Sequence, residues 1–364
     1  MLKNDLTKRI DRAIKERVFP GCVVGIVERE NTERTFQPHI KSRISSYGHL
    51  TYDHDAPKTD VMTPYDIASV TKVFTALVLL RLVQEGRVDL DKAVSHYIPE
   101  FDTELKKNKV LVRHLVTYTL DLRLPSLASL KEQAPLEIIM TILEAPLQGD
   151  PGERVLYVNA TAILMGLIAM NVTNTSLGKL IQEFFLEPLG LLHTTLSPLA
   201  LFNKERIAPT EICPWRKKTL QGEVHDESTH ILQKCFDLGA AGLFSTVPDL
   251  LTLGEVLINR GRMRGNQYFS PETIRSMCHR DGEQERVFAW CHNAHRYMGK
   301  KCSQETFGMT GFTGCSIVCD YARGVGIVLL SNRTWPTRPK NSDAINEVRR
   351  DVADIVYRCI DNRD

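Results

Sequence analysis

The amino-acid sequence predicts an α+β fold: an antiparallel β-sheet flanked by terminal helices, plus an inserted, mainly helical domain. Short β-branched runs lie near both ends of the chain, at residues 22–27 and 326–330. Amphipathic helical patterns flank these runs, and helical spacing dominates the middle of the chain. We therefore expect residues 1–66 and 245–364 to form a discontinuous sheet domain, residues 67–244 to form the helical domain, and the active site to lie between them.

The N-terminal segment predicts a helix followed by strands. Leu6, Ile10 and Ile14 recur at helical spacing, which indicates a helix that lays one apolar stripe on a core. The β-branched run at residues 22–27 is bounded by turn residues and predicts a strand. Residues 47–52 are expected to continue the meander.

A long apolar segment begins the middle of the chain. Residues 73–85 are apolar on nearly every side, are too many for a typical strand, and end at Gly86 as helices commonly do. They predict a buried helix. Further helices are expected at residues 135–144, 161–170 and 177–185, joined by loops that contain Pro and Gly.

The β character returns towards the C-terminus. After a helix expected at residues 249–259, consecutive strands are expected at 314–319 and 326–330, with a turn at 320–324. A final helix is expected at residues 344–359, with one apolar face. The two ends of the chain would thus supply the sheet and its terminal helices.

Composition indicates an ordinary globular protein of enzyme size. The 364 residues are 43% hydrophobic and 25% charged, and the net charge of +2 gives no reason to expect a nucleic-acid partner. No uncharged apolar stretch reaches the roughly 18 residues of a membrane span, and the first residues lack the apolar run of a signal peptide. We expect a cytoplasmic protein with no membrane partner. The oligomeric state is left open.

Cysteine and histidine spacing does not indicate a metal site. The nine cysteines follow no regular spacing, and in a reducing compartment we expect them to be free thiols. One Cys/His grouping lies within residues 213–235 and another within residues 291–302. Neither has the paired short spacing of a structural zinc site, so no metal is expected.

The first candidate catalytic motif is Ser69-Val70-Thr71-Lys72, at the start of the long apolar helix. A spacing of three places the Ser69 hydroxyl and the Lys72 amine on one helix face. A desolvated lysine can accept or relay the serine proton, and the helix N-terminus favours the developing negative charge. Ser176-Leu177-Gly178-Lys179 has the same spacing, but it lies in a polar run and is expected to be a helix cap.

The second motif, Tyr157-Val158-Asn159, lies just before a predicted helix. Its position allows a loop to present a phenol and an amide side by side. A phenol near a lysine can act as general base for serine and then as acid for the leaving group, and the amide can hold a substrate carbonyl. The alternative is a partly buried structural tyrosine with a loop-capping asparagine.

The third motif is Gly308-Met309-Thr310-Gly311-Phe312-Thr313-Gly314, which leads directly into a predicted strand. Its small residues would let a substrate lie against the strand backbone. The backbone amides of Ser69 and Phe312 are candidate donors of an oxyanion hole. A glycine-rich β-turn without a catalytic role is the alternative. The candidate substrate-binding residues are Asn159, Met309, Thr310, Gly311 and Phe312.

In this order and spacing, the three motifs resemble those of the serine β-lactamase and penicillin-binding protein superfamily, nearest its class C-like and esterase (family VIII-like) branch. The likeness extends over nearly the whole chain. The resemblance implies an antiparallel sheet of five or more strands with flanking helices and a helical domain. It also implies an acyl-enzyme on Ser69, formed with help from Lys72 and Tyr157 and resolved by water or an acceptor nucleophile, with no cofactor.

The chain departs from the family pattern at several positions. Met309 stands where the family usually has Lys or His, and a thioether cannot assist recognition of a substrate carboxylate. Leu120-Asp121 replaces a small Ser-Gly turn, and Ala240 stands where related sequences often carry His. His225 is a candidate residue for lining or bracing the pocket, with a structural salt bridge as the alternative. Trp290 is a candidate pocket wall near the third motif.

The sequence therefore favours a serine hydrolase that cleaves an ester or amide of a small acyl or peptide-like substrate. Weak or absent β-lactamase activity is expected, because Met309 carries no charge. One alternative is a cytoplasmic acyltransferase that uses the same acyl-enzyme. A second is a catalytically silent binding protein with this fold. The identities of the substrate and the acceptor are left open.

Overall fold

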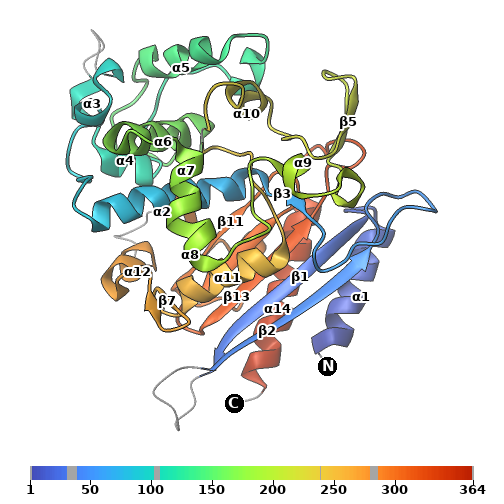
Figure 1. The fold of residues 1–364 in the computed structure, drawn as a ribbon. Helices are drawn as coiled ribbons and strands as arrows, with labels where there is room; N and C mark the ends of the chain where they lie inside the picture. The colour runs from blue at the N-terminus through green and yellow to red at the C-terminus, as the bar shows by residue number, and fades with distance from the viewer. Residues whose placement is uncertain (1, 31–38, 102–106, 238, 279–285, 363–364) are drawn as a thin grey trace.

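The computed structural model describes residues 2–30, 39–101, 107–237, 239–278 and 286–362 of the chain (Figure 1). Its centre is a seven-stranded sheet with the order β2-β1-β13-β12-β11-β10-β9. Every neighbouring pair is antiparallel, which confirms the predicted fold class. The strands are β1 (Gly21–Glu30), β2 (His39–Gly48), β9 (Arg286–Val287), β10 (Trp290–His292), β11 (Thr306–Thr310), β12 (Ser316–Asp320) and β13 (Val325–Ser331).

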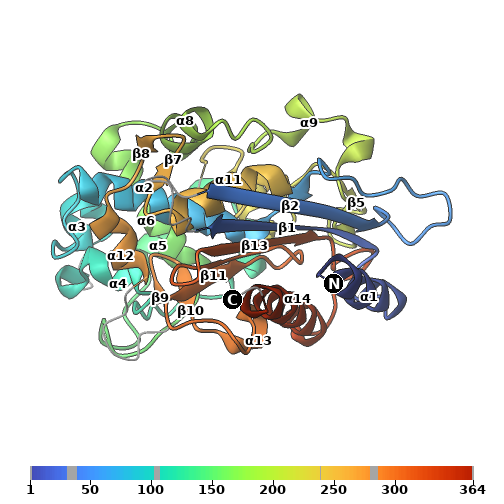
Figure 2. The same cartoon turned by 90° about the horizontal axis from the view of Figure 1, so that it is seen from below.

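One face of the sheet is covered by helices from the two ends of the chain (Figure 2). Leu6 and Ile10 from the first helix and Val348 and Val352 from the last helix share a buried cluster with Val24 of β1. These are the stripes that helical periodicity predicts. The helices on this face are α1 (Leu2–Lys15), α13 (His295–Met298) and α14 (Asp343–Asp361).

The other face of the sheet packs against α11 (Val247–Ile258), which contacts β1, β12 and β13 (Figure 2). Gly25 of β1 makes this close approach possible, because a Cβ there would lie 2.4 Å from Val247 Cγ1 and 2.8 Å from Leu251 Cδ1. The β1 strand is therefore covered on both faces. Beside α11 lie the hairpin β7 (Arg262–Met263) with β8 (Asn266–Gln267), and α12 (Pro271–Cys278).

The middle of the chain is mainly helical. The two-residue strands β3 (Tyr65–Asp66) and β6 (Phe244–Ser245) pair with each other where the chain enters and leaves this part. Strands β4 (Glu211–Cys213) and β5 (Lys218–Leu220) form a small hairpin. The helices are α2 (Thr71–Gln84), α3 (Val94–Tyr97), α4 (Val112–Val116), α5 (Pro135–Glu144), α6 (Asn159–Thr173), α7 (Leu177–Ile181), α8 (Glu187–Leu189), α9 (Pro198–Leu201) and α10 (Glu227–Leu232).

Among the described residues, six short helical turns complete this part. Five are 3₁₀ turns, of which η1 directly precedes α2, and one is a π-helical turn between α7 and α8. They are η1 (Ala68–Val70), η2 (Pro99–Phe101), η3 (Lys107–Lys109), η4 (Leu127–Leu130), η6 (Lys204–Arg206) and the π turn η5 (Gln182–Leu186).

Two predicted elements differ in the structure. Strand β2 occupies residues 39–48, so the strand expected at residues 47–52 ends at Gly48, whose φ of +73° turns the chain. The helix expected at residues 177–185 is divided by the π-helical turn before α8. Pro188 has no N–H to continue the regular hydrogen-bond ladder there.

Candidate active site

Ser69 lies in η1, immediately before α2, on a turn that one buried carboxylate holds together. Asp66 accepts hydrogen bonds from the backbone N–H of Ala68 at 2.8 Å and of His225 at 2.7 Å. Ala68 has a φ of +46°, which is unusual for a residue with a side chain. Burial raises the pKa of Asp66 to about 6, against the lowering effect of these two hydrogen bonds. The turn that presents Ser69 is therefore fixed by its own hydrogen bonds.

The Lys72 amine contacts the Ser69 hydroxyl directly. Lys72 Nζ donates to Ser69 Oγ at 2.9 Å and to the carbonyl oxygen of Ala240 at 2.6 Å. The side chain is fully buried, which is rare for lysine unless the amine has partners. The structure thus brings together the two residues of the first motif, and it uses the backbone of Ala240 to hold the amine.

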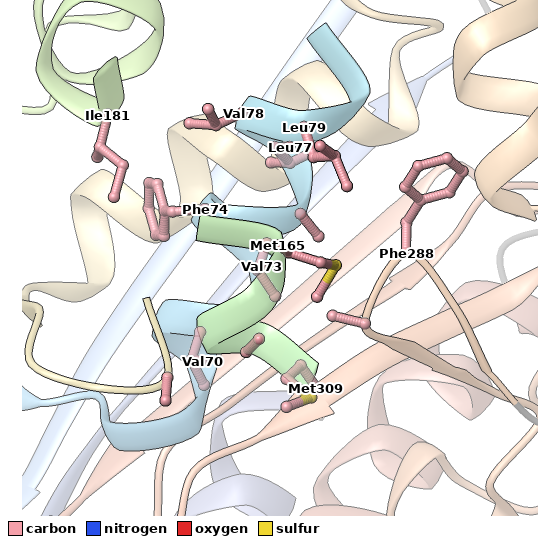
Figure 3. Packing of buried hydrophobic residues seen from close by; sticks show 14 of the residues in the cluster. Val70, Val73, Phe74, Leu77, Val78, Leu79, Met165, Ile181, Phe288 and Met309 are labelled. Carbon is pink, nitrogen blue, oxygen red and sulfur yellow. The ribbon is translucent and has the colours of Figure 1, made fainter. Parts of the chain in front are cut away.

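The burial of Lys72 follows from the position of α2. Figure 3 shows α2 packed among other elements, with Val73 and Leu77 near Met165 of α6 and with Met309 of β11 below. Phe74 on the same helix stacks edge-on against Phe185. A helix that is apolar on every side is stable only when it is enclosed. The sequence of α2 therefore removes Lys72 from water.

Tyr157 lies next to the amine. Lys72 Nζ is 5.3 Å from the centroid of the Tyr157 ring, and this ring stacks on Tyr118 with a centroid separation of 5.4 Å. Tyr118 is fully buried, and burial raises its pKa well above the usual value, so it supports the stack as a neutral ring. Tyr157 is 41% exposed. The Tyr157 ring can therefore contact both the Lys72 amine and a ligand that enters from solvent.

Asn159, the first residue of α6, is tied to a buried carboxylate. Its Nδ2 donates to Asp226 Oδ2 at 3.2 Å. Asp226 also caps α10, accepting from Ser228 Oγ and from the Thr229 N–H, both at 2.7 Å. Burial opposes ionisation, but these hydrogen bonds keep the pKa of Asp226 below its usual value. Asp226 therefore orients the amide of the second motif.

The third motif packs against the Ser69 turn. A Cβ on Gly311 would lie 2.4 Å from the carbonyl oxygen of Ile67, so only glycine fits this approach. Thr313 Oγ1 donates to the carbonyl oxygen of Asp66 at 2.7 Å. Arg349 of α14 is buried and donates to the carbonyl oxygens of Gly311 at 3.1 Å and Cys315 at 2.8 Å. All three predicted motifs thus meet at one place.

Two predicted pocket residues are buried. His225 is 3% exposed, and its ring lies 5.5 Å from that of Phe312, which is 45% exposed. Burial, with a further contribution from Arg338, lowers the pKa of His225 to about 3, so its ring is neutral. Trp290 is fully buried and packs edge-on against Phe307 with a centroid separation of 5.0 Å. The structure therefore places His225 against Phe312, and Trp290 in the core beside β11.

A pocket of about 400 Å³ adjoins Tyr157, and it is lined mainly by apolar side chains but also by Asn159 and the carboxylates of Asp121 and Asp226. Leu120, fully buried, lines one side of it, and the carboxylate of the neighbouring Asp121 is bound by Arg154. Several leucines from the 120–128 segment complete its wall. A pocket of this size and lining suits a small apolar group. The other lining residues include Leu122, Leu124, Pro125, Leu127, Leu156 and Val158.

The structure adds a cation that the sequence did not indicate. The Arg286 Cζ lies 4.3 Å from the centroid of the Tyr157 ring, and Arg286 Nη1 is 3.9 Å from Met309 Sδ. In sequence, Arg286 looks like one more charged surface residue. The sequence also did not indicate that Asp66 and Arg349 support the site. Their contacts join segments that are far apart in the sequence.

Ser176, the alternative nucleophile, has a different role. Its Oγ accepts the backbone N–H of Lys179 at 3.3 Å and caps α7, as the sequence predicted.

Among the residues that the structure describes, no group of three or more His, Cys, Asp or Glu is placed to hold a metal ion. Within those same residues no single helix is long and apolar enough to cross a bilayer, and α6 with the segment Leu177–Leu189 passes that test only as a pair bent by 83°.

Known proteins share both the sequence pattern and the fold. The family model described as Beta-lactamase matches residues 6–350. An Escherichia coli (strain K12) protein named "Putative D-alanyl-D-alanine carboxypeptidase" is 32% identical over 307 residues, which cover 76% of this chain and 70% of that protein.

Two solved structures have a similar fold. EstCE1, titled a hydrolase with promiscuous acyltransferase activity, aligns with a TM-score of 0.74 at 19% identity over 98% of each chain. A class C β-lactamase aligns with a TM-score of 0.72 at 20% identity over 96% of this chain and 95% of its own. The family match spans nearly all of the chain and includes all three motifs. The chain therefore belongs to the Beta-lactamase family of serine hydrolases.

Proposed function

We propose that this protein cleaves an ester or amide of a small acyl or peptide-like substrate through an acyl-enzyme on Ser69. The observation that carries the proposal is the 2.9 Å contact between Lys72 Nζ and Ser69 Oγ, with the Tyr157 ring 5.3 Å from the same amine. Nucleophile and proton acceptor are already within hydrogen-bond reach, as nucleophilic catalysis requires. The D-alanyl-D-alanine carboxypeptidase name of the relative supports a peptide-like substrate.

In the proposed acylation, Ser69 Oγ forms a bond to the acyl carbon while its proton passes to the Lys72–Tyr157 pair. The bond from the acyl carbon to the leaving oxygen or nitrogen then breaks, and the pair returns the proton to that atom. The backbone amides of Ser69 and Phe312 are proposed to stabilise the oxyanion. Close packing of Gly311 on Ile67 supports this assignment, since it fixes the third motif against the Ser69 turn.

The acyl part of the substrate is proposed to occupy the pocket of about 400 Å³ beside Tyr157. Its leucine lining favours an apolar acyl group. Water completes the cycle by attacking the acyl carbon and releasing Ser69. The acyltransferase alternative differs only at this last step, where an alcohol or amine replaces water.

The cytoplasmic location expected from the sequence stays a prediction.

Steady-state hydrolysis of p-nitrophenyl esters tests the proposal. We expect Ser69→Ala to reduce kcat/KM at least about a thousandfold, because the covalent route is lost. Ser176→Ala is the matched control and should stay within about twofold of wild type, since Ser176 only caps α7. Loss of activity in Ser176→Ala with retention in Ser69→Ala would contradict the proposal. Adding an alcohol acceptor and measuring transfer product against free acid separates hydrolase from acyltransferase.

A further inference from the structure

The side of the site near Met309 carries a positive charge that does not come from the three motifs. Arg286 is the first residue of β9, and its Cζ lies 4.3 Å from the centroid of the Tyr157 ring. The same guanidinium places Nη1 3.9 Å from Met309 Sδ and donates to the carbonyl oxygen of Ala289 at 3.1 Å. The Arg286 side chain therefore reaches from β9 to Met309 and to the Tyr157 ring.

The β9–β10 hairpin holds Arg286 in this position. Its two turn residues, Phe288 and Ala289, have φ values of +47° and +68°, as in the tight turns that suit the twist of a hairpin. Arg286 is paired with Cys291 in the ladder, and Cys291 is paired in turn with Gly308 of β11. The guanidinium is thus carried on the sheet that also carries the third motif, so its position relative to Met309 is fixed.

The charge of Arg286 is available to a ligand. Both partners of Nη1 among the described residues, the Ala289 carbonyl and the Met309 thioether, are neutral. The side chain is only partly buried, whereas Lys72, the other cation near Tyr157, is fully buried. Guanidinium groups bind carboxylates through two parallel hydrogen bonds, which gives both affinity and orientation.

We infer that Arg286 is a specificity-determining residue that binds a carboxylate on the leaving group of the substrate. The inference rests on the proposed function, in which Tyr157 with Lys72 returns a proton to the leaving atom. The pocket assigned to the acyl group is lined by Tyr157 but not by Arg286 or Met309. A group that contacts the guanidinium, which lies beside the Tyr157 ring and Met309, is therefore assigned to the leaving side of the scissile bond. The substrate class is an ester or amide whose leaving alcohol or amine carries a carboxylate, as in an acylated amino acid.

A matched pair of esters tests this inference. The substrates are 3-acetoxybenzoate and 3-acetoxybenzamide, whose leaving phenols differ in charge and have nearly the same shape. In wild type we expect kcat/KM for the carboxylate ester to exceed that for the amide by about 10- to 100-fold, the usual value of a hydrogen bond to a charged group. This ratio should fall as salt concentration rises, because the guanidinium is partly exposed to solvent.

The variant Arg286→Gln should reduce the ratio about tenfold or more, and Arg286→Lys should give an intermediate ratio, since it keeps the charge and loses the planar fork. Arg262→Gln is the matched control. Arg262 is an exposed arginine in the β7–β8 hairpin whose side chain contacts Gln267, so its removal should leave the ratio unchanged. Circular dichroism and the thermal midpoint check that each variant folds. If Arg286→Gln does not fold, the Arg286→Lys ratio decides the test.

Labelling of Ser69 with a fluorophosphonate separates this inference from the proposed function. If wild type labels at Ser69 and hydrolyses both esters equally, the Arg286 inference is wrong and the proposed function stands. A wild-type preference that Arg286→Gln leaves intact also overturns the inference. If Ser69 is not labelled and neither ester is hydrolysed, both proposals fail.

Discussion

Two adjacent buried residues show how single side chains support the Ser69 turn. Asp66 accepts the backbone N–H groups of Ala68 and His225, and the neutral His225 ring lies under Phe312. Burial raises the pKa of Asp66 to about 6 and lowers that of His225 to about 3. The two residues therefore have opposite effects on stability in mildly acidic solution. Burial disfavours the charged form of each.

The pH dependence of stability tests the buried position of His225. Because its pKa is lower in the fold than the ordinary 6.5, its contribution to stability is present above pH 6.5 and is lost as the pH falls towards 3. We predict that the difference in unfolding free energy between wild type and His225→Asn shrinks by about 2 kcal/mol from pH 7 to pH 5. Asp66 is present in both proteins, so its opposite effect cancels. Urea unfolding at the two pH values measures this difference, and a constant difference would contradict it.

At the scale of elements, the site depends on how closely the end of β11 approaches the turn before α2. Gly311 permits this approach, and Arg349 of α14 holds the Gly311 carbonyl from the opposite side of the sheet. A hydrogen bond from Thr313 Oγ1 to the Asp66 carbonyl also joins the segment after β11 to the turn before α2. The relative position of Ser69 and the Phe312 amide is therefore a property of packing between elements.

The substitution Gly311→Ala tests this packing. Its Cβ would lie 2.4 Å from the Ile67 carbonyl oxygen, a backbone atom that cannot move aside alone, so β11 must shift away from the turn. We expect the thermal midpoint to fall, with a loss of about 1–3 kcal/mol in stability, and kcat/KM to fall about a hundredfold.

Gly254→Ala in α11 is the matched control for that substitution. A Cβ at position 254 would lie 3.6 Å from Val27 Cγ1, an ordinary contact. We expect this variant to keep wild-type activity and to gain slightly in helix stability. Equal losses in the two variants would show that any added methyl group harms the protein and would contradict the packing account.

At the scale of the whole molecule, clear patterns of apolar residues predicted the elements that matter most. Residues 135–144 form α5 with the predicted bounds, and the apolar run after Ser69 forms α2, because a single dominant pattern decided each. Strand β2 was largely missed. It is an edge strand with His39, Lys41 and Arg43 among its residues, and such charged edges obscure the strand pattern.

The candidate site was predictable where its residues lie in local motifs. Ser69, Lys72, Tyr157 and the residues from Met309 to Phe312 were each placed by short sequence patterns that the fold brings together. Arg286 could not be predicted, since its contacts with Tyr157 and Met309 depend on the register of β9, β10 and β11. Only the three-dimensional structure contains that information.

The most direct test for an acyl-enzyme on Ser69 is intact-mass spectrometry of the protein after incubation with p-nitrophenyl acyl esters and with a fluorophosphonate. Wild type and Ser69→Ala are compared, and peptide mapping locates any adduct. We expect one covalent adduct on wild type, located at Ser69, and none on Ser69→Ala. Wild type that carries no adduct from any probe, or an adduct that persists in Ser69→Ala, would contradict it.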